Sequence, residues 1–307
     1  MAHSYNRWKP CRPLSWPCKV YIRHREEHRR MIWSLHCASK YTFKMLGQTG
    51  ALRTDLAQNH FATTSRSVTV QQWQDDFKQF SNWTNLNQLL AQSACFETYI
   101  ASILKLVFDS DPGLIVGASH HIDGVRQLKL GTNIDNKITD MHLTNCTKGT
   151  WQSRISAITS LFGHTFNSLS NYCGDLEKLR EIRNNVGHAF GRSINLSQNY
   201  GSPTMQPMTR VSERTVTKYF KIINEIVREL DLYLMLNHVG NFQEFHYLHN
   251  KFASLALPNE SVFKSDLTAH AQEVYSLQFC KWVITYYKNL EKIQSFKRSV
   301  IKDLKRN

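Results

Sequence analysis

Apolar residues recur at three- and four-residue steps over long stretches of this chain, a spacing typical of amphipathic helices. The clearest case predicts two consecutive helices, Val70–Phe80 and Trp83–Phe108, which end at Asp109–Gly113, a run of turn-forming residues. The same spacing predicts five more helices, Trp151–Phe162, Leu176–Arg192, Ser212–Asn237, Asn241–Ala256 and Ala269–Asn289. Because these stretches are also poor in proline, the pattern predicts an all-α fold, an up-and-down helical bundle with additional C-terminal helices.

Two stretches interrupt the helical pattern. Prolines at positions 10, 13 and 17 break the first fifty residues, so helix is expected there only from about Tyr21. Several glycines and a cluster of Asp and Asn make 114–146 irregular, and we expect a loop or a pair of short strands, one of them at Val125–Leu130. This segment is a candidate for substrate choice.

The predicted helix Leu176–Arg192 carries the most suggestive chemistry. Asn184 and His188 are four residues apart and so share one face, which Arg183 borders. An Arg fork matches two phosphate oxygens, an imidazole gives or takes a proton near neutral pH, and an amide can orient either partner. On spacing alone, a structural helix with a surface Arg and a partly buried His is the favoured alternative. A glycine in the middle of a helix, such as Gly187, is less favourable than alanine by about 1 kcal/mol. Its presence suggests that a second helix or a bound strand packs there.

The run EIRNNVGH at 181–188 resembles the RNxxxH motif of HEPN-domain ribonucleases. Its flanks are similar to those of the family, with a long earlier helix at Ala94–Phe108 that contains an acid, Glu97, and with Gly149–Gly163 and Val211–Gly240 before and after the motif. The resemblance covers about Val70–Gly240 and is greatest to the RiboL-PSP type. We therefore divide the chain into a basic, partly irregular N-terminal extension (1–60), a HEPN-like helical domain (61–240) and a C-terminal helical extension with a basic tail (241–307).

The resemblance implies a metal-independent endoribonuclease without cofactor, a homodimer in which two motif helices meet at a two-fold axis. His188 would act as general base or acid in the attack of a ribose 2′-hydroxyl on the adjacent phosphate. Arg183 would hold the phosphate charge, and Asn184 would orient the substrate or His188. Glu97 is either a partner that fixes Arg183 or His188, or an unremarkable exposed or cap-paired acid.

Many relatives are toxins or anti-phage effectors that cut tRNA or mRNA, so the resemblance also implies a defence role and an antitoxin or sensor protein encoded nearby. In one toxin subgroup a tyrosine, the target of an inactivating modification, lies two residues after the histidine. Here that residue is Phe190, so silencing by this route is not expected. The competing hypothesis is a non-catalytic RNA- or protein-binding module on the same fold. Exposure distinguishes the two, because Arg183 and His188 should be open to a shared cleft if catalytic and buried and paired if structural.

The charge of +14 is confined to the two ends of the chain. Residues 1–53 hold eleven Lys and Arg against two acids, residues 288–307 hold seven against two, and the stretch between them is neutral. Aromatic residues are interleaved with the N-terminal charges, namely Trp8, Trp16, Tyr21 and Trp33. Such ends can bind phosphates and stack on bases, and Lys297 and Arg298 of the C-terminal end are predicted to bind RNA. Arg192, which follows the motif, is predicted to bind RNA as well. Solvated tails are the alternative.

Seven cysteines without paired spacing, and the lack of a secretion signal, indicate a reducing compartment, and we expect a cytoplasmic protein. No apolar run is long enough for a membrane span. Two groupings have a metal-like spacing, Cys18, His24 and His28 with Cys11 or Cys37, and His120 and His121 with Asp123 or His142. Zinc sites usually contain a tight Cys pair, which the first grouping lacks, and a surface loop is the favoured interpretation of the second, so no metal ligand is assigned. A zinc-dependent nucleic-acid binder is the weakest of the three functional hypotheses.

Overall fold

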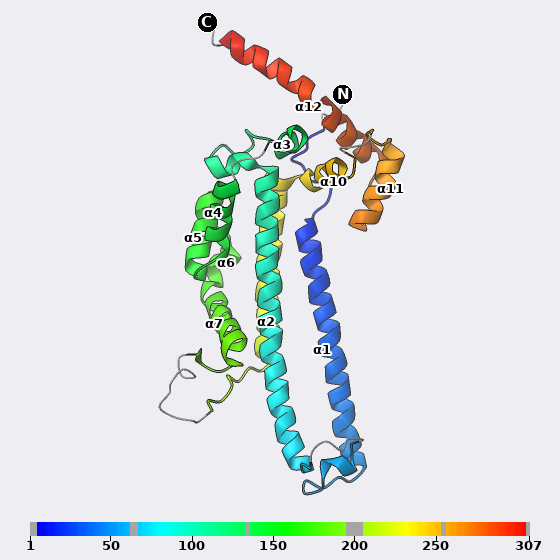
Figure 1. The fold of residues 1–307 in the computed structure, drawn as a ribbon, viewed down its shortest axis with the longest axis vertical. Coiled ribbons are helices and arrows are strands. Elements are labelled where there is room, and N and C mark those ends of the chain that lie inside the picture. The colour runs from blue at the N-terminus through cyan, green and yellow to red at the C-terminus, as the bar shows by residue number, and fades with distance from the viewer. Residues whose placement is uncertain (1–4, 62–66, 133–135, 195–204, 253–255, 305–307) are drawn as a thin grey trace. The chain divides into compact units, whose positions relative to one another are not determined.

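The computed structural model describes residues 5–61, 67–132, 136–194, 205–252 and 256–304, with side chains as far as residue 290. The regular structure of these residues is helical, apart from one isolated antiparallel bridge between Leu56 and Thr69 (Figure 1). The α-helices are α1 (Trp16–Gln48), α2 (Val70–Ser110), α3 (Gly124–Leu130), α4 (Asn136–Thr147), α5 (Trp151–Phe162), α6 (Asn167–Asn171), α7 (Cys173–Ala189), α9 (Glu213–Leu234), α10 (Phe242–Phe252), α11 (Glu260–Ala271) and α12 (Leu277–Leu304). None of the described helices is long and apolar enough to cross a membrane. The all-α prediction is confirmed.

Helix α2 replaces two predicted helices with one. It runs without interruption from Val70 to Ser110, through the point between Phe80 and Trp83 where a break was expected (Figure 1). No glycine or proline lies there, and the hydroxyls of Ser81 and Thr84 each donate to the carbonyl one turn earlier, so the polar residues are accommodated within the helix. The predicted end at 109–113 is correct.

Most of the described residues of 114–146 are helical, whereas 117–123 form turns, so the prediction of a loop holds for that part alone and the prediction of a strand is wrong. Residues 125–130, proposed as a strand, belong to α3. The carboxylate of Asp123 accepts a hydrogen bond from the Val125 N–H at 2.9 Å and caps the helix, and Gly131 ends it with φ 64°. A cap at Asp123 and a stop at Gly131 enclose seven residues and specify one short helix.

The predicted helices downstream are found with one exception. α5 has the predicted bounds, and its four predicted inward residues are buried. α9 begins after Ser212, whose hydroxyl accepts from the Thr215 N–H at 3.2 Å. The predicted helix Ala269–Asn289 is wrong, because α11 ends at Ala271 and α12 begins at Leu277, with Gln272 in the left-handed region (φ 52°) between them.

The chain forms two compact units, each assembled from distant segments. Unit 1 contains 1–19, 99–167 and 227–307, and unit 2 contains 20–98 and 168–226. The core of unit 1 includes Ile103, Val107, Ile158, Phe166, Phe242, Phe245, Phe263 and Val283, and that of unit 2 includes Leu86, Leu89, Phe96, Leu176, Leu179 and Ile223. The predicted division into a HEPN-like domain with two extensions stays a prediction.

Arg7 and Ser15, near the described start of the chain, are buried in unit 1, and no helix precedes Trp16 among the described residues. The backbone of Arg7 and that of Gly240 approach so closely that a Cβ on Gly240 would lie 2.2 Å from the Arg7 carbonyl oxygen. Helix α1 starts at Trp16, five residues earlier than predicted, because Ser15 caps it and Pro17 falls in its first turn, where proline is tolerated.

Candidate functional site

Helix α7 carries the motif residues within unit 2. Its buried side consists of Leu176 and Leu179, which pack in the unit's core. The helix ends at Ala189, and the Gly191 N–H donates to the Asn185 carbonyl at 2.9 Å, with Gly191 at φ 76°. A Cβ on Gly191 would lie 2.6 Å from Leu86 Cδ1 of α2, so this turn needs glycine for both space and conformation. The motif face therefore has a fixed position on α2.

Arg183 is held by two oxygens. Its Nη2 lies 2.6 Å from Oε2 of Glu97 on α2, and its Nη1 donates to Oδ1 of Asn184 at 3.1 Å. The side chains of Arg183 and Glu97 are 33% and 24% exposed, so solvent still reaches the pair. The structure thus places Glu97 against Arg183. This contact agrees with the interpretation of Glu97 as a partner of the motif arginine.

His188 lies in the last turn of α7 and is exposed. No hydrogen bond or ion pair joins its ring to another described residue. The imidazole is therefore accessible to a ligand, whereas Arg183 is partly occupied.

Acids offset the cations on this side of α7. Arg180 pairs with Glu177 at 2.5 Å, and the hydrogen bonds that Arg180 donates to this carboxylate are the main cause that raises the pKa of Arg180. Glu181 and Glu97 raise the pKa of Arg180 further. A phosphate bound at Arg183 would thus have to compete with Glu97 in a field of mixed sign.

Of the predicted RNA-binding residues, Arg192 has a described side chain, whereas Lys297 and Arg298 do not. Arg192 donates from Nε to the Gln206 carbonyl at 2.6 Å, and its guanidinium lies over the ring of Phe190, 5.2 Å from the centroid. It therefore anchors the described start of 205–210 to the end of α7. Lys297 and Arg298 fall on α12, where side chains lie outside the described residues.

Most of the N-terminal aromatic residues have structural partners. Trp8 stacks on His120 with centroids 4.1 Å apart, Trp16 packs edge-on against His270, and Tyr21 is buried. Trp33 is 68% exposed. Of the four aromatics assigned to base stacking, Trp33 alone presents an open ring in the described structure.

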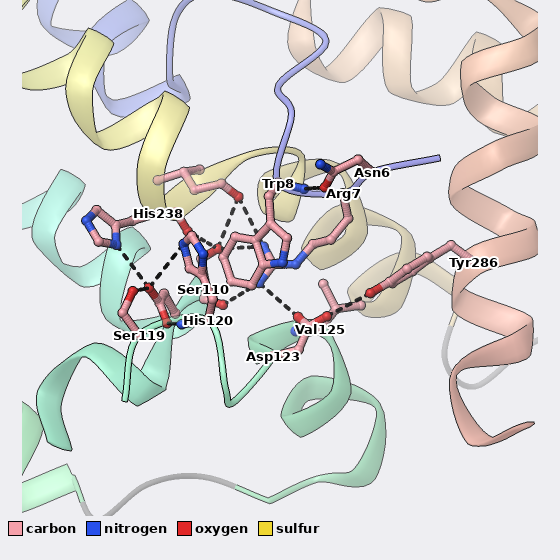
Figure 2. Close-up of polar contacts among 12 residues, drawn as sticks. Asn6, Arg7, Trp8, Ser110, Ser119, His120, Asp123, Val125, His238 and Tyr286 are labelled. Atoms are coloured by element: carbon pink, nitrogen blue, oxygen red, sulfur yellow. Dashed lines mark hydrogen bonds and ion pairs between the residues drawn. The ribbon is translucent and has the colours of Figure 1, made fainter. Parts of the chain in front are cut away.

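A second polar centre, in unit 1, was not predicted (Figure 2). Arg7 is 1% exposed, pairs with Asp123 at 2.9 Å, and donates to the hydroxyl and carbonyl of Ser110 at 2.9 and 2.7 Å. Burial lowers the pKa of Arg7, and the charge of Asp123 opposes that shift. Its partners lie more than a hundred positions away, so no local pattern marked Arg7 as a core residue.

Asp111 forms the other half of this centre and is fully buried. Its Oδ2 accepts from Ser119 Oγ at 2.5 Å and lies 2.9 Å from His238 Nδ1, and its Oδ1 accepts from the His120 N–H at 2.8 Å. Burial pushes the pKa of Asp111 upward, but these three hydrogen bonds outweigh it and hold the pKa below its ordinary value. Asp111 looked like a helix stop in the sequence, and His238 carried no signal at all.

The two metal-like groupings considered from the sequence differ from what the fold assembles. Within the described residues, one set of at least three His, Cys, Asp or Glu side chains has its ligand atoms close enough for a metal ion, namely Asp111, His120 and His238. The sequence grouped His120 with His121, Asp123 or His142, whereas the structure places it near Asp111 and His238.

Comparison with known proteins identifies no relative. No protein-family model, no curated protein and no solved structure matches the chain.

Proposed function

We propose that this protein is a metal-independent endoribonuclease of HEPN type, active as a homodimer with two α7 helices facing each other. The observation that carries the proposal is the exposed imidazole of His188 one turn after Asn184, beside an arginine that Glu97 fixes at 2.6 Å. The motif residues lie on α7, and Glu97, which pairs with Arg183, lies on α2. Catalytic residues are best held in place on such rigid elements.

The reaction uses groups that α7 supplies. The ribose 2′-oxygen attacks the adjacent phosphorus as a base removes its proton, the P–O5′ bond breaks, and an acid protonates the departing 5′-oxygen. His188 of one protomer would be the base and its symmetry mate the acid, because one chain offers one such histidine on this face and a two-fold axis offers two. Arg183 would balance the charge that develops on the phosphate, and Asn184 would orient the substrate. The products are a 2′,3′-cyclic phosphate and a 5′-hydroxyl.

Such an enzyme fits the role of a toxin or anti-phage effector that cuts tRNA or mRNA, restrained by an antitoxin or sensor protein. The basic chain ends would add affinity that does not depend on sequence.

Cleavage of total cellular RNA by the purified chain in EDTA tests the proposal. Wild-type protein is expected to leave 5′-hydroxyl ends, whereas His188→Ala and Arg183→Ala are expected to lose at least about a hundredfold in rate. His36→Ala, which removes an exposed histidine of α1 in the same unit, is the matched control and should cleave normally. A 2′-deoxy substitution at the mapped cut site should abolish cleavage there. Equal activity of the wild type and His188→Ala, or no cleavage of any RNA by a confirmed dimer, would refute the proposal.

One observation favours the competing function, a non-catalytic binding module. Arg183 already has a carboxylate and an amide as partners, and a paired arginine can serve packing alone. Under this alternative, His188→Ala leaves RNA cleavage at background and RNA or protein binding unchanged, while Arg183→Ala lowers stability without a functional effect of its own.

A further inference from the structure

Besides the buried Arg7–Asp123 salt bridge, the polar centre of unit 1 contains one carboxylate and two imidazoles that could bind a metal ion. Asp111 lies between α2 and η2 (Pro112–Val116), His120 lies in the turn that follows η2, and His238 belongs to the π-helical turn η3 (Met235–Val239). Three segments of unit 1 thus converge on one point, and Figure 2 shows Ser119, His120 and His238 close together there. We propose that Asp111, His120 and His238 bind a divalent transition-metal ion, with zinc the first choice.

The spacing of the ligand atoms fits such an ion. His238 Nδ1 is 2.9 Å and His120 Nε2 is 3.7 Å from the same oxygen, Oδ2 of Asp111, and all three atoms lie within 4.8 Å of one another. Zinc bonds of about 2.0–2.1 Å in a tetrahedron place ligand atoms about 3.3 Å apart. Small side-chain rotations therefore convert the present arrangement into a coordination shell.

The ligand types also match. Neutral imidazole nitrogen and carboxylate oxygen are the ligands that zinc takes besides thiolate, and three protein ligands leave a fourth position for water. Asp111 supplies the one negative charge of the set. The nearby cation, Arg7, is neutralised by Asp123 at 2.9 Å, so it adds little repulsion against a bound ion.

A surrounding shell holds the carboxylate in place. Ser119 Oγ and the His120 N–H donate to Asp111, which is the kind of support that orients ligating carboxylates in metal sites. His120 adopts φ 64°, which is uncommon for any residue but glycine, and this conformation directs both its N–H and its ring to Asp111. The π-helical turn that carries His238 is a rare structure that often marks functional sites.

Access and exchange are both possible. The His120 side chain is 46% exposed, so an ion can reach the carboxylate from solvent, although Asp111 and His238 are buried. His120 Nε2 now contacts the Asn237 carbonyl and would exchange this contact for the metal. With a metal on Nδ1, the ring proton of His238 would lie on Nε2, which has no hydrogen-bond partner in the described structure; the ring lies 5.2 Å from that of Phe162.

Zinc binding to the full-length chain tests the site without reference to activity. After EDTA treatment and dialysis, calorimetry with zinc chloride is expected to show one equivalent bound, and the melting temperature should rise with zinc concentration. Asp111→Asn and His120→Ala should each weaken binding about a hundredfold or more. His120→Ala removes a half-exposed ring, so it carries the test even where Asp111→Asn fails to fold. His121→Ala, the neighbouring exposed histidine, is the matched control and should bind normally.

Cobalt distinguishes this site from adventitious binding to the seven free cysteines. Bound cobalt(II) should give visible bands of a nitrogen and oxygen site, without the near-ultraviolet charge-transfer band of a thiolate. The proposal fails if the wild type binds no zinc, if the thiolate band appears, or if His121→Ala loses as much affinity as His120→Ala. The site is independent of the ribonuclease, because binding is measured directly and the cleavage assay is run in EDTA.

Discussion

The two polar centres of this protein differ in how much water reaches them. In unit 1, Arg7 and Asp111 are at most 1% exposed and every charge has a close partner. In unit 2, Arg183 and Glu97 are 33% and 24% exposed, and His188 is open to solvent. Buried charges must be paired, and the loss of one partner is costly, whereas exposed charges are screened and cost little to change. The comparison teaches that the charges of the first centre depend on one another for stability, whereas side chains of the second can change at little cost and remain accessible to solvent.

The largest expected effect is on Arg7. Arg7→Leu leaves Asp123 and the carbonyls of Ser110 and Val239 without their donor, so the free energy of unfolding should fall by about 3–5 kcal/mol. Urea denaturation measures this. Arg12→Leu is the control, since Arg12 is about one-third exposed and lies 3.8 Å from Glu273, and it should cost less than about 1 kcal/mol. An equal fall in the free energy of unfolding in both variants would mean that the burial of Arg7 does not add to stability.

A second buried acid of unit 1 should make stability depend on pH. Glu244 of α10 is 1% exposed, and burial raises its pKa from 4.5 to about 7. Because the folded-state pKa is the higher one, the protonated acid is stable in the fold below pH 4.5, and stability is lost as the pH rises through 7. The difference in the free energy of unfolding between Glu244→Gln and the wild type should therefore shift in favour of the variant by on the order of 3 kcal/mol between pH 4.5 and pH 8. Melting curves at these two pH values test this, and a constant difference between the proteins would contradict it.

A smaller effect is expected on the exposed side of α7. A Cβ on Gly187 would meet no described atom of the single chain within 4 Å, so the expected neighbour, a second helix or a bound strand, would have to come from another molecule. Gly187→Ala should stabilise the monomer by up to about 1 kcal/mol, the difference in helix propensity. If two α7 helices meet in a dimer, the same change should weaken association in sedimentation experiments. A gain in stability with unchanged association would place the dimer interface elsewhere.

The smallest effect on stability is expected at Glu97. Glu97→Gln removes one charge from a pair that is about a quarter to a third exposed, so unfolding free energy should change by less than about 1 kcal/mol. If Glu97 positions Arg183 for catalysis, kcat for RNA cleavage should fall. If it only competes with phosphate for the guanidinium, KM should fall instead and kcat should stay constant. The two constants, measured on one oligonucleotide, separate positioning from competition.

The chain's sequence determined the features that depend on near neighbours. Apolar spacing is a local property, so the all-α fold, the bounds of α5 and the start of α9 at Ser212 were predictable. The motif on α7 was also visible, because Arg183, Asn184 and His188 lie within two turns of one helix. The union of the two predicted helices in α2 was missed, since polar residues at 81–84 interrupt the apolar pattern without breaking the helix.

Only the tertiary structure decided what depends on distant segments. Arg7 reads as one more charge of a basic tail, and it becomes a core residue because Asp123 and Ser110 meet it there. Asp111 and His238 are 127 positions apart, and no local pattern relates them, yet the fold brings Oδ2 and Nδ1 to 2.9 Å. The physical reason is that burial and pairing are set by which helices pack together. Local sequence fixes the helices but leaves their partners open.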